Sequence, residues 1–308
     1  MKRMIVRILL MVTLWTMPII CSGQLQNGDI IISEFFDDLF LVDPETNSQT
    51  NIYNEDRFLL NLAGSGNTVF SYDFGEGLIE IDLAAGTTDV IADINVNEIT
   101  FDQTDNLIVS SNLGIQRYDR SLGLFSTIAS TGYDDVVVSL QGEIFVTDTF
   151  AGVGRLNNEG EFESLFDPGF GFDDLTIGSD GFIYTYSPFD GLHRINPITG
   201  EGNMLADDIF SSIDDLVGLE NGNLLISGVF DIDGDGLQDD GLYEYNPLTG
   251  KLVSVIDEST NNLTFWAPSD VFVVGGIFAT IPEPTLFPVV ATLMVGVASR
   301  RIRKSSPS

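Results

Sequence analysis

GLHRIN, at residues 191–196, is one copy of a short phrase that recurs along this 308-residue chain. The copies are DLFLVD (38–43), GLIEID (77–82), GIQRYD (114–119), GVGRLN (152–157), GLHRIN (191–196) and GLYEYN (241–246). Each copy ends in Asp or Asn, and these last residues are separated by 39, 37, 38, 39 and 50 positions. A period of about 40 residues is typical of a repeat architecture, and the longer last interval indicates an insertion of about 12 residues.

Each repeat contains further apolar segments separated by turn residues. A segment such as GEIFVT (142–147) precedes the phrase, and an alternating stretch such as DDVVVSLQG (134–142) precedes that segment. A turn such as Pro247–Gly250 follows the phrase and leads into a fourth stretch, KLVSVID (251–257). Four short strands per repeat of about 40 residues are typical of a propeller blade. The sequence therefore predicts an all-β, six-bladed propeller over residues 24–276.

The first repeat lacks its first strand, because it starts directly at GDIIIS (28–33). A solitary strand pattern, APSDVFVVGG (267–276), follows the sixth repeat. We expect this strand to pair into the first blade and close the ring, which removes the open sheet edges that all-β proteins must avoid. The periodicity and the repeated phrase resemble the six-bladed extracellular propellers that include NHL-repeat and streptogramin-lyase-like proteins. That resemblance implies an architecture and not an activity.

The N-terminus predicts a signal peptide over residues 1–23. Lys2, Arg3 and Arg7 precede an apolar core of 13 residues (8–20), and Ser22 and Gly23 follow as small residues before the cleavage point. The alternative is a membrane anchor, but a spanning helix needs about 20 apolar residues. Cleavage after Gly23 removes Cys21, the single cysteine of the chain, so the mature protein has no disulfide and no thiolate.

The C-terminal segment, residues 277–308, contains Pro282-Glu283-Pro284, then an apolar run (286–298), and then Arg300 and Arg301. This order resembles the PEP-CTERM sorting signal of Gram-negative bacteria. The resemblance implies a short hydrophobic helix, transient anchoring in the inner membrane, processing by an exosortase-type enzyme, and delivery to the cell surface or extracellular matrix. Retention of the segment as a weak anchor is the alternative.

The predicted mature domain is strongly acidic. Without the leader and the C-terminal segment, six basic and 45 acidic residues remain, a formal charge of −39, and Lys251 is the only lysine. Such a surface repels phosphate backbones and excludes nucleic acid as a partner, whereas it attracts cations.

The insertion in the sixth repeat, DIDGDGLQDD (231–240), predicts a calcium site. The ligands would be the carboxylates of Asp231, Asp233, Asp235 and Asp239 and the carbonyl of Leu237, because Ca²⁺ takes six to eight oxygen ligands and alternate carboxylates on a tight loop converge. Position 12 is Leu242 and not the Glu of an EF-hand, so the loop resembles the β-hairpin calcium loops of integrin-type propellers and thrombospondin-type repeats. The alternative is a solvated acidic turn.

An acid also stands at the start of five expected innermost strands, which line the central channel: Glu98, Asp135, Asp174, Asp215 and Asp270. One interpretation is a site for a metal or polar ligand at the channel mouth. The other, which we expect, is that these carboxylates accept hydrogen bonds from backbone N–H groups of neighbouring blades.

Catalytic residue types are scarce. His193, the single histidine, is expected on a strand surface. The mature chain has almost none of the residues that Ser-His-Asp or Cys-His catalysis requires. We therefore expect an exported, non-catalytic, calcium-binding propeller whose ligand is a polysaccharide or a surface protein. The alternative is a metal-dependent hydrolase or lyase with its site at the channel mouth, as in calcium-dependent lactonase-like propellers.

Overall fold

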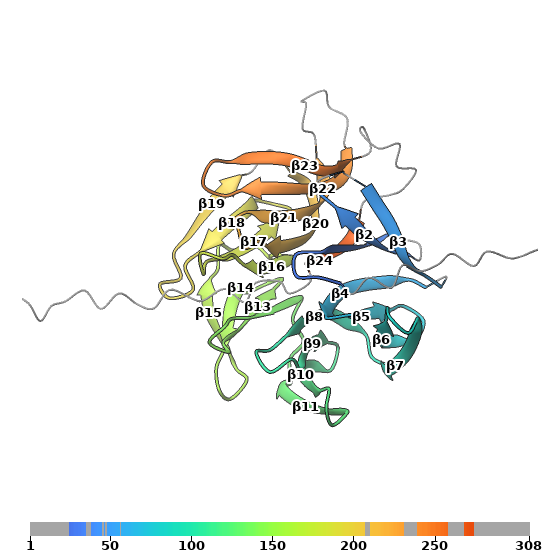
Figure 1. The fold of residues 1–308 in the computed structure, drawn as a ribbon. Helices are drawn as coiled ribbons and strands as arrows, with labels where there is room; N and C mark the ends of the chain where they lie inside the picture. The colour runs from blue at the N-terminus through green and yellow to red at the C-terminus, as the bar shows by residue number, and fades with distance from the viewer. Residues whose placement is uncertain are drawn as a thin grey trace, which may run out of the picture.

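The computed structural model describes residues 25–34, 38–44, 46, 48–55, 57–206, 210–230, 239–257 and 268–273. These residues form six four-stranded antiparallel sheets arranged around a central axis (Figure 1). The predicted all-β, six-bladed propeller is confirmed. The described strands run from Ile30 to Val273.

Each blade runs from an innermost strand at the channel to an outermost strand at the rim, and all its neighbouring strands are antiparallel. Blade 1 comprises β24 (Pro268–Val273), β1 (Ile30–Glu34), β2 (Asp38–Asp43) and β3 (Ser48–Asn54). Blade 2 comprises β4 (Leu59–Ser65), β5 (Thr68–Asp73), β6 (Gly77–Asp82) and β7 (Thr87–Ala92). Blade 3 comprises β8 (Val96–Phe101), β9 (Leu107–Ser111), β10 (Gly114–Asp119) and β11 (Leu124–Ala129).

The second half of the ring repeats this plan. Blade 4 comprises β12 (Asp135–Val138), β13 (Ile144–Asp148), β14 (Gly152–Leu156) and β15 (Phe162–Phe166). Blade 5 comprises β16 (Asp174–Ile177), β17 (Ile183–Ser187), β18 (Gly191–Ile195) and β19 (Gly202–Ala206). Blade 6 comprises β20 (Phe210–Gly218), β21 (Leu224–Phe230), β22 (Asp239–Asn246) and β23 (Lys251–Asp257).

The hydrophobic core lies between neighbouring blades. Side chains alternate along a strand between its two faces, so each blade presents one apolar face to each neighbour. In one such layer, Tyr184 and Leu192 of blade 5 pack with Leu216 and Tyr243 of blade 6. Similar layers join every neighbouring pair of blades, so the core is a ring of layers around the axis.

The ring is closed by β24, the last described strand. It pairs antiparallel with β1, with Phe272 opposite Ile31 and Val271 opposite Ile32. The Phe272 ring also packs over Gly64 of blade 2, where a Cβ atom would collide with it. This pairing confirms the predicted closure of blade 1.

The glycine that begins the repeated phrase has a structural reason. Gly114 has a φ of 107° and Gly152 a φ of 76°, in the left-handed region that favours glycine. A Cβ at Gly114 would also collide with the carbonyl oxygen of Ala129 on the outermost strand. The start of the third strand therefore requires glycine in these blades.

No helix long and apolar enough to cross a membrane is found in the described part of the chain. The predicted signal peptide and the predicted sorting segment with Pro282, Glu283, Pro284, Arg300 and Arg301 lie outside the described residues.

Candidate functional site

The candidate site is the mouth of the central channel, on the face where the innermost strands begin. We call this the ring face. The strands β8, β12, β16, β20 and β24 each contribute one of the predicted acids: Glu98, Asp135, Asp174, Asp215 and Asp270. Their strands contact one another in sequence around the axis, together with β4. The structure therefore brings all five acids to one channel mouth.

Blade 2 supplies a sixth member that the sequence analysis missed. Asn61 on β4 precedes Leu62 as Asp215 precedes Leu216, and its Nδ2 donates to the carbonyl of Val96 on β8 at 3.1 Å. Asn61 also has a φ of 56°. The apolar segment LLNLAGS (59–65) could have identified this position from the sequence. We missed it because the turn to the next strand is shorter than in the other blades and because its ring residue is an amide.

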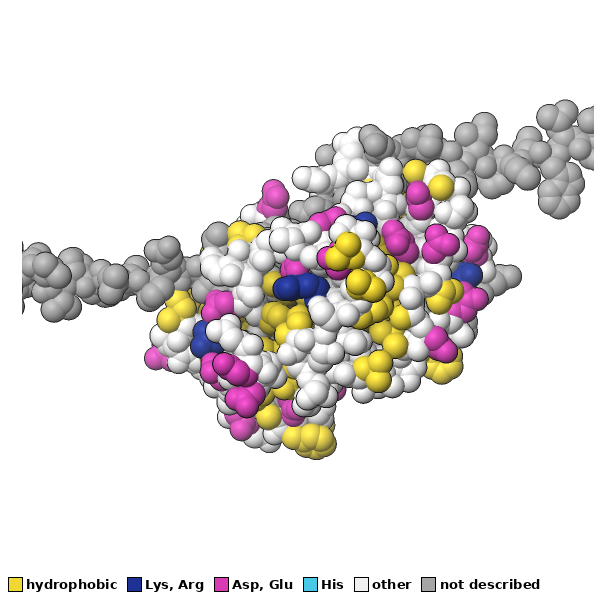
Figure 2. Space-filling model, turned by 90° about the horizontal axis from the view of Figure 1, so that it is seen from below, with side chains coloured by type: hydrophobic (Ala, Val, Ile, Leu, Met, Phe, Trp, Pro, Cys, Tyr) yellow, Lys and Arg dark blue, Asp and Glu magenta, His cyan; other side chains and the backbone are white. Residues whose placement is uncertain are grey.

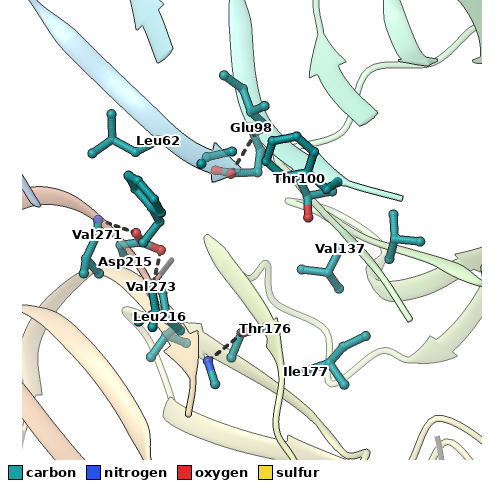
Figure 3. A pocket seen from close by; sticks show the side chains of 18 of the residues that line it. Leu62, Glu98, Thr100, Val137, Thr176, Ile177, Asp215, Leu216, Val271 and Val273 are labelled. Atoms are coloured by element: carbon teal, nitrogen blue, oxygen red, sulfur yellow. Dashed lines mark hydrogen bonds between the residues drawn. The ribbon is translucent and has the colours of Figure 1, made fainter. Parts of the chain in front are cut away.

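Several ring residues connect neighbouring blades. Asp215 accepts the backbone N–H of Leu216 on Oδ1 and that of Val271, in blade 1, on Oδ2, both at 2.7 Å (Figure 3). Asp270 accepts the N–H of Leu62, in blade 2, at 2.8 Å. With Asn61 these bonds link blades 6, 1, 2 and 3. We call them interblade struts, because they satisfy backbone groups that strand pairing leaves without partners.

Asp174 departs from this pattern. Its Oδ1 accepts the N–H of Leu175 at 2.7 Å, but its buried Oδ2 faces no hydrogen-bond donor among the described residues. Its carboxyl lies beside that of Asp135. A hydrogen bond between two carboxyls requires that one of them be protonated. Asp135 and Asp174 therefore either share a proton or form no hydrogen bond with each other.

Burial raises the pKa of all five ring acids. It raises the pKa of Asp135 to about 7, although the neighbouring Asp174 carboxyl, when it carries the proton, and the Val136 N–H act in the opposite direction. For Glu98, Asp174 and Asp270, burial is the largest cause of the raised pKa and neighbouring carboxylates add to it. Burial also raises the pKa of Asp215. The ring is therefore not fully ionised at neutral pH.

A cavity of about 390 Å³ occupies the channel beside the ring. Its wall includes Thr100, Val137, Thr176 and Val217 from four innermost strands, and Figure 3 shows Thr100, Val137 and Thr176 around the open space. Its volume lies within the range of small-molecule pockets. In the described part of the chain, no three acidic or histidine side chains are grouped so that they could hold one metal ion.

The expectation that His193 lies on a strand surface is wrong. Its side chain packs against the rings of Phe166, Phe170 and Phe172, and the residue is only 3 % exposed. Its Nε2 lies 3.1 Å from Asp190 Oδ2. Burial lowers the pKa of His193, against the opposing effect of Asp190. The histidine fills the layer between blades 4 and 5, and pattern alone could not reveal that the third strand has both faces covered.

Most of the predicted calcium loop, including Asp231, Asp233, Asp235 and Leu237, lies outside the described residues. The strands that flank it are described. Phe230, the last residue of β21, pairs with Asp239, the first residue of β22. The loop therefore joins the second and third strands of blade 6.

On the side of the molecule that Figure 2 shows, acidic side chains occur at many places and basic side chains at few. This distribution agrees with the formal charge of −33 for the whole chain.

Comparisons with known proteins identify a fold and no family. No protein-family profile matches the sequence, and no curated protein matches it. TolB from Acinetobacter baumannii has a similar structure, with a TM-score of 0.57 and 15% identity, over 71% of this chain and 61% of that one. A protein of unknown function from Bacteroides thetaiotaomicron has a TM-score of 0.55 and 13% identity, over 75% of this chain and 64% of that one.

This chain spans less than two thirds of the length of either of these structures. At such low identity the likeness shows the propeller fold alone.

Proposed function

We propose that this protein is an exported propeller that binds a ligand at the cell surface or in the extracellular matrix without transforming it. The ligand would be a polysaccharide or another surface protein. An exosortase-type enzyme would process the C-terminal segment, and Ca²⁺ held by Asp231, Asp233, Asp235, Asp239 and the Leu237 carbonyl would brace the loop of blade 6.

One observation carries the non-catalytic part of this proposal. Asp215 and Asp270 direct carboxylate oxygens at backbone N–H groups of the next blade, at 2.7 and 2.8 Å. Groups that stabilise the ring in this way are poorly available to a substrate. The burial of His193 also supports a non-catalytic function, because the single histidine is then shielded from solvent.

Delivery is tested by producing the full chain in a Gram-negative host that contains an exosortase-type enzyme and in the same host without it. We expect a surface protein that starts at Gln24 and lacks the residues beyond Glu283, identified by mass spectrometry of both ends. In the host without the enzyme, the C-terminal segment should remain. An intact segment on surface protein from both hosts contradicts sorting by cleavage.

Ligand binding is tested with the processed protein and with matrix from the producing cells. Protease treatment of the matrix removes a protein ligand, and periodate oxidation damages a polysaccharide ligand. We expect one treatment to abolish binding and the other to leave it. A processed protein that does not bind untreated matrix contradicts the proposal.

A second candidate is a metal-dependent hydrolase or lyase at the channel mouth. It is favoured by Asp174, whose buried Oδ2 faces no donor among the described residues beside a cavity of about 390 Å³. Hydrolysis of a panel of lactones with added Ca²⁺, Mn²⁺ or Zn²⁺ tests it. Activity that Asp174→Asn abolishes and that the exposed neighbour variant Asp173→Asn retains would establish this candidate in place of the first.

A further inference from the structure

Four turns on the ring face each display an apolar side chain to solvent. The turns connect the second and third strands of blades 2, 3, 4 and 5, and the side chains are Phe74, Leu113, Phe150 and Phe189. They are 75, 54, 92 and 81 % exposed. We call these four residues the apolar crown. A single exposed apolar side chain is ordinary on a protein surface, but here the same turn carries one in four consecutive blades, which we take as the mark of an interaction site.

The crown extends along the part of the channel mouth that blades 2 to 5 form. An innermost strand begins on the ring face, the second strand returns to it, and the turn to the third strand therefore lies there too. The same connection recurs in four consecutive blades. The crown residues thus stand at corresponding places around the ring acids.

Hydrogen bonds fix the backbone at these turns. The N–H of Phe150 donates to Asp148 Oδ1 at 2.8 Å, and the N–H of Leu113 donates to Ser111 Oγ at 3.1 Å. The N–H of Phe189 donates to Ser187 Oγ at 3.3 Å. Because the turns are held before any partner arrives, binding orders little additional chain, which favours affinity.

The charge around the crown is negative. Asp134, Asp173 and Asp214, each of which directly precedes a ring acid, are exposed on the same face. The one basic residue that the described chain places there, Arg57, already contacts Asp73 and Glu76 at 3.2 and 2.6 Å.

The other basic residues lie toward the opposite face. Four arginines pair there with acids next to the turns between first and second strands, and Lys251 follows a turn between third and fourth strands. The four pairs are Arg117–Asp102, Arg120–Asp105, Arg155–Glu143 and Arg194–Asp180. The basic residues of the described chain therefore lie mostly on the face opposite the crown.

We propose that the apolar crown and the exposed aspartates beside it form a docking surface for a polypeptide that presents apolar side chains flanked by Lys or Arg. The apolar side chains would bury the phenyl rings, and the cationic groups would complement Asp134, Asp173 and Asp214. A second copy of this chain would bring like charges together. The inference deepens the binding function proposed above by naming the surface and the class of partner.

The test compares two variants of the processed protein. The crown variant is Phe74→Ser, Phe150→Ser and Phe189→Ser. The control variant is Leu122→Ser, Ile198→Ser and Leu248→Ser, which removes three side chains that are 68, 42 and 83 % exposed in turns of the opposite face. Because all six side chains are exposed, both variants should melt within a few degrees of the wild type.

The probe is a fluorescent peptide of alternating Phe and Lys, and binding is measured by anisotropy. One comparison peptide has Glu in place of Lys, and the other has Ser in place of Phe. We expect the crown variant to bind the Phe–Lys peptide at least about tenfold more weakly than the wild type, because buried aromatic residues dominate interface affinity. The control variant should stay within about twofold, and both comparison peptides should bind weakly.

Equal binding by the crown variant and the wild type overturns the proposal. Equal binding of the Ser–Lys and Phe–Lys peptides also overturns it, because charge alone would then explain the affinity. Crown-dependent binding of alginate or dextran without peptide binding would assign the surface to a polysaccharide. Crown-dependent self-association in sedimentation would assign it to a second copy.

This test is independent of the broader proposal. If the wild type and the crown variant bind matrix equally, the docking surface is refuted and the binding function stands. If the wild type binds no matrix, the function fails, while the peptide assay still decides the surface.

Discussion

Asp215 and Val271 are joined by a hydrogen bond of 2.7 Å between carboxylate Oδ2 and backbone N–H, at the junction where blade 6 meets blade 1. The same carboxyl accepts the N–H of Leu216 with its other oxygen. The bond matters because β24 follows β23 along the chain but belongs to blade 1. One side chain therefore fixes the innermost strands on both sides of the ring closure.

Asp215→Ala should destabilise the propeller by about 1–3 kcal/mol, because it leaves the N–H groups of Leu216 and Val271 without their acceptor. Relief of repulsion among the ring acids opposes part of this loss. Urea unfolding measures the change, and Asp93→Ala, an exposed acid between blades 2 and 3, is the matched control. Equal midpoints for the two variants would show that the strut contributes nothing.

Stability should decrease as pH rises from about 4 to about 7. Burial raises the pKa of Asp135 to about 7 in the folded state, whereas an unfolded Asp titrates near ~3.9. The folded state thus binds more protons across this window, and the stabilisation present below it is lost as pH rises through the folded pKa. Melting temperatures across this range should fall with increasing pH.

A general gain from neutralising a polyanion would give the same trend, so a variant separates the two causes. Asp135→Asn keeps this position uncharged and should flatten the pH dependence. Asp93→Asn removes an exposed acid and should leave the slope nearly unchanged. If the melting temperatures of the two variants change with pH at the same slope, the ring acids are not the source of the pH dependence.

Deletion from residue 267 onward should destabilise the whole ring, because it removes β24 with the Asp270 strut and the Phe272 packing over Gly64. Truncation after Gly276 keeps every described strand and should melt like the full chain. Thermal unfolding of the two truncated proteins compares them directly. Identical melting temperatures would be incompatible with a ring that β24 closes.

Calcium should raise the melting temperature, because an ion that binds only the folded state stabilises it by about 2.7 kcal/mol at a hundredfold excess over its dissociation constant. Asp233→Ala with Asp235→Ala should abolish most of this rise. Magnesium is the control, since it prefers strict octahedral geometry and keeps its water but still screens the acidic surface. If magnesium stabilises as well as calcium and the double variant responds like the wild type, the loop is only an acidic turn.

The fold could be predicted from the sequence because every blade of a propeller must meet similar structural requirements. Four of the blades have a glycine where the third strand begins, and the second strands are apolar, so the pattern recurs with a nearly constant period. The ring acids recurred for the same reason. Asn61 was not recognised from the sequence because a shorter turn changes the spacing of the residue pattern in blade 2 relative to the other blades.

Other features could not be read from one sequence. The burial of His193 depends on three phenylalanines that lie 21 to 27 positions away, and only the packing of two blades brings them around the ring. The apolar crown could not be recognised from the sequence either. Phe74, Phe150 and Phe189 look like core residues until the topology places them at the tips of turns.

The pairing of β24 with β1 sets an order of events for the growing chain. β1 leads and β24 comes after all the other described strands, so the edge of β1 stays unpaired until synthesis has passed Val273. A chain that ends before β24 therefore lacks the innermost strand of blade 1 and leaves the edge of β1 open to pairing with other chains.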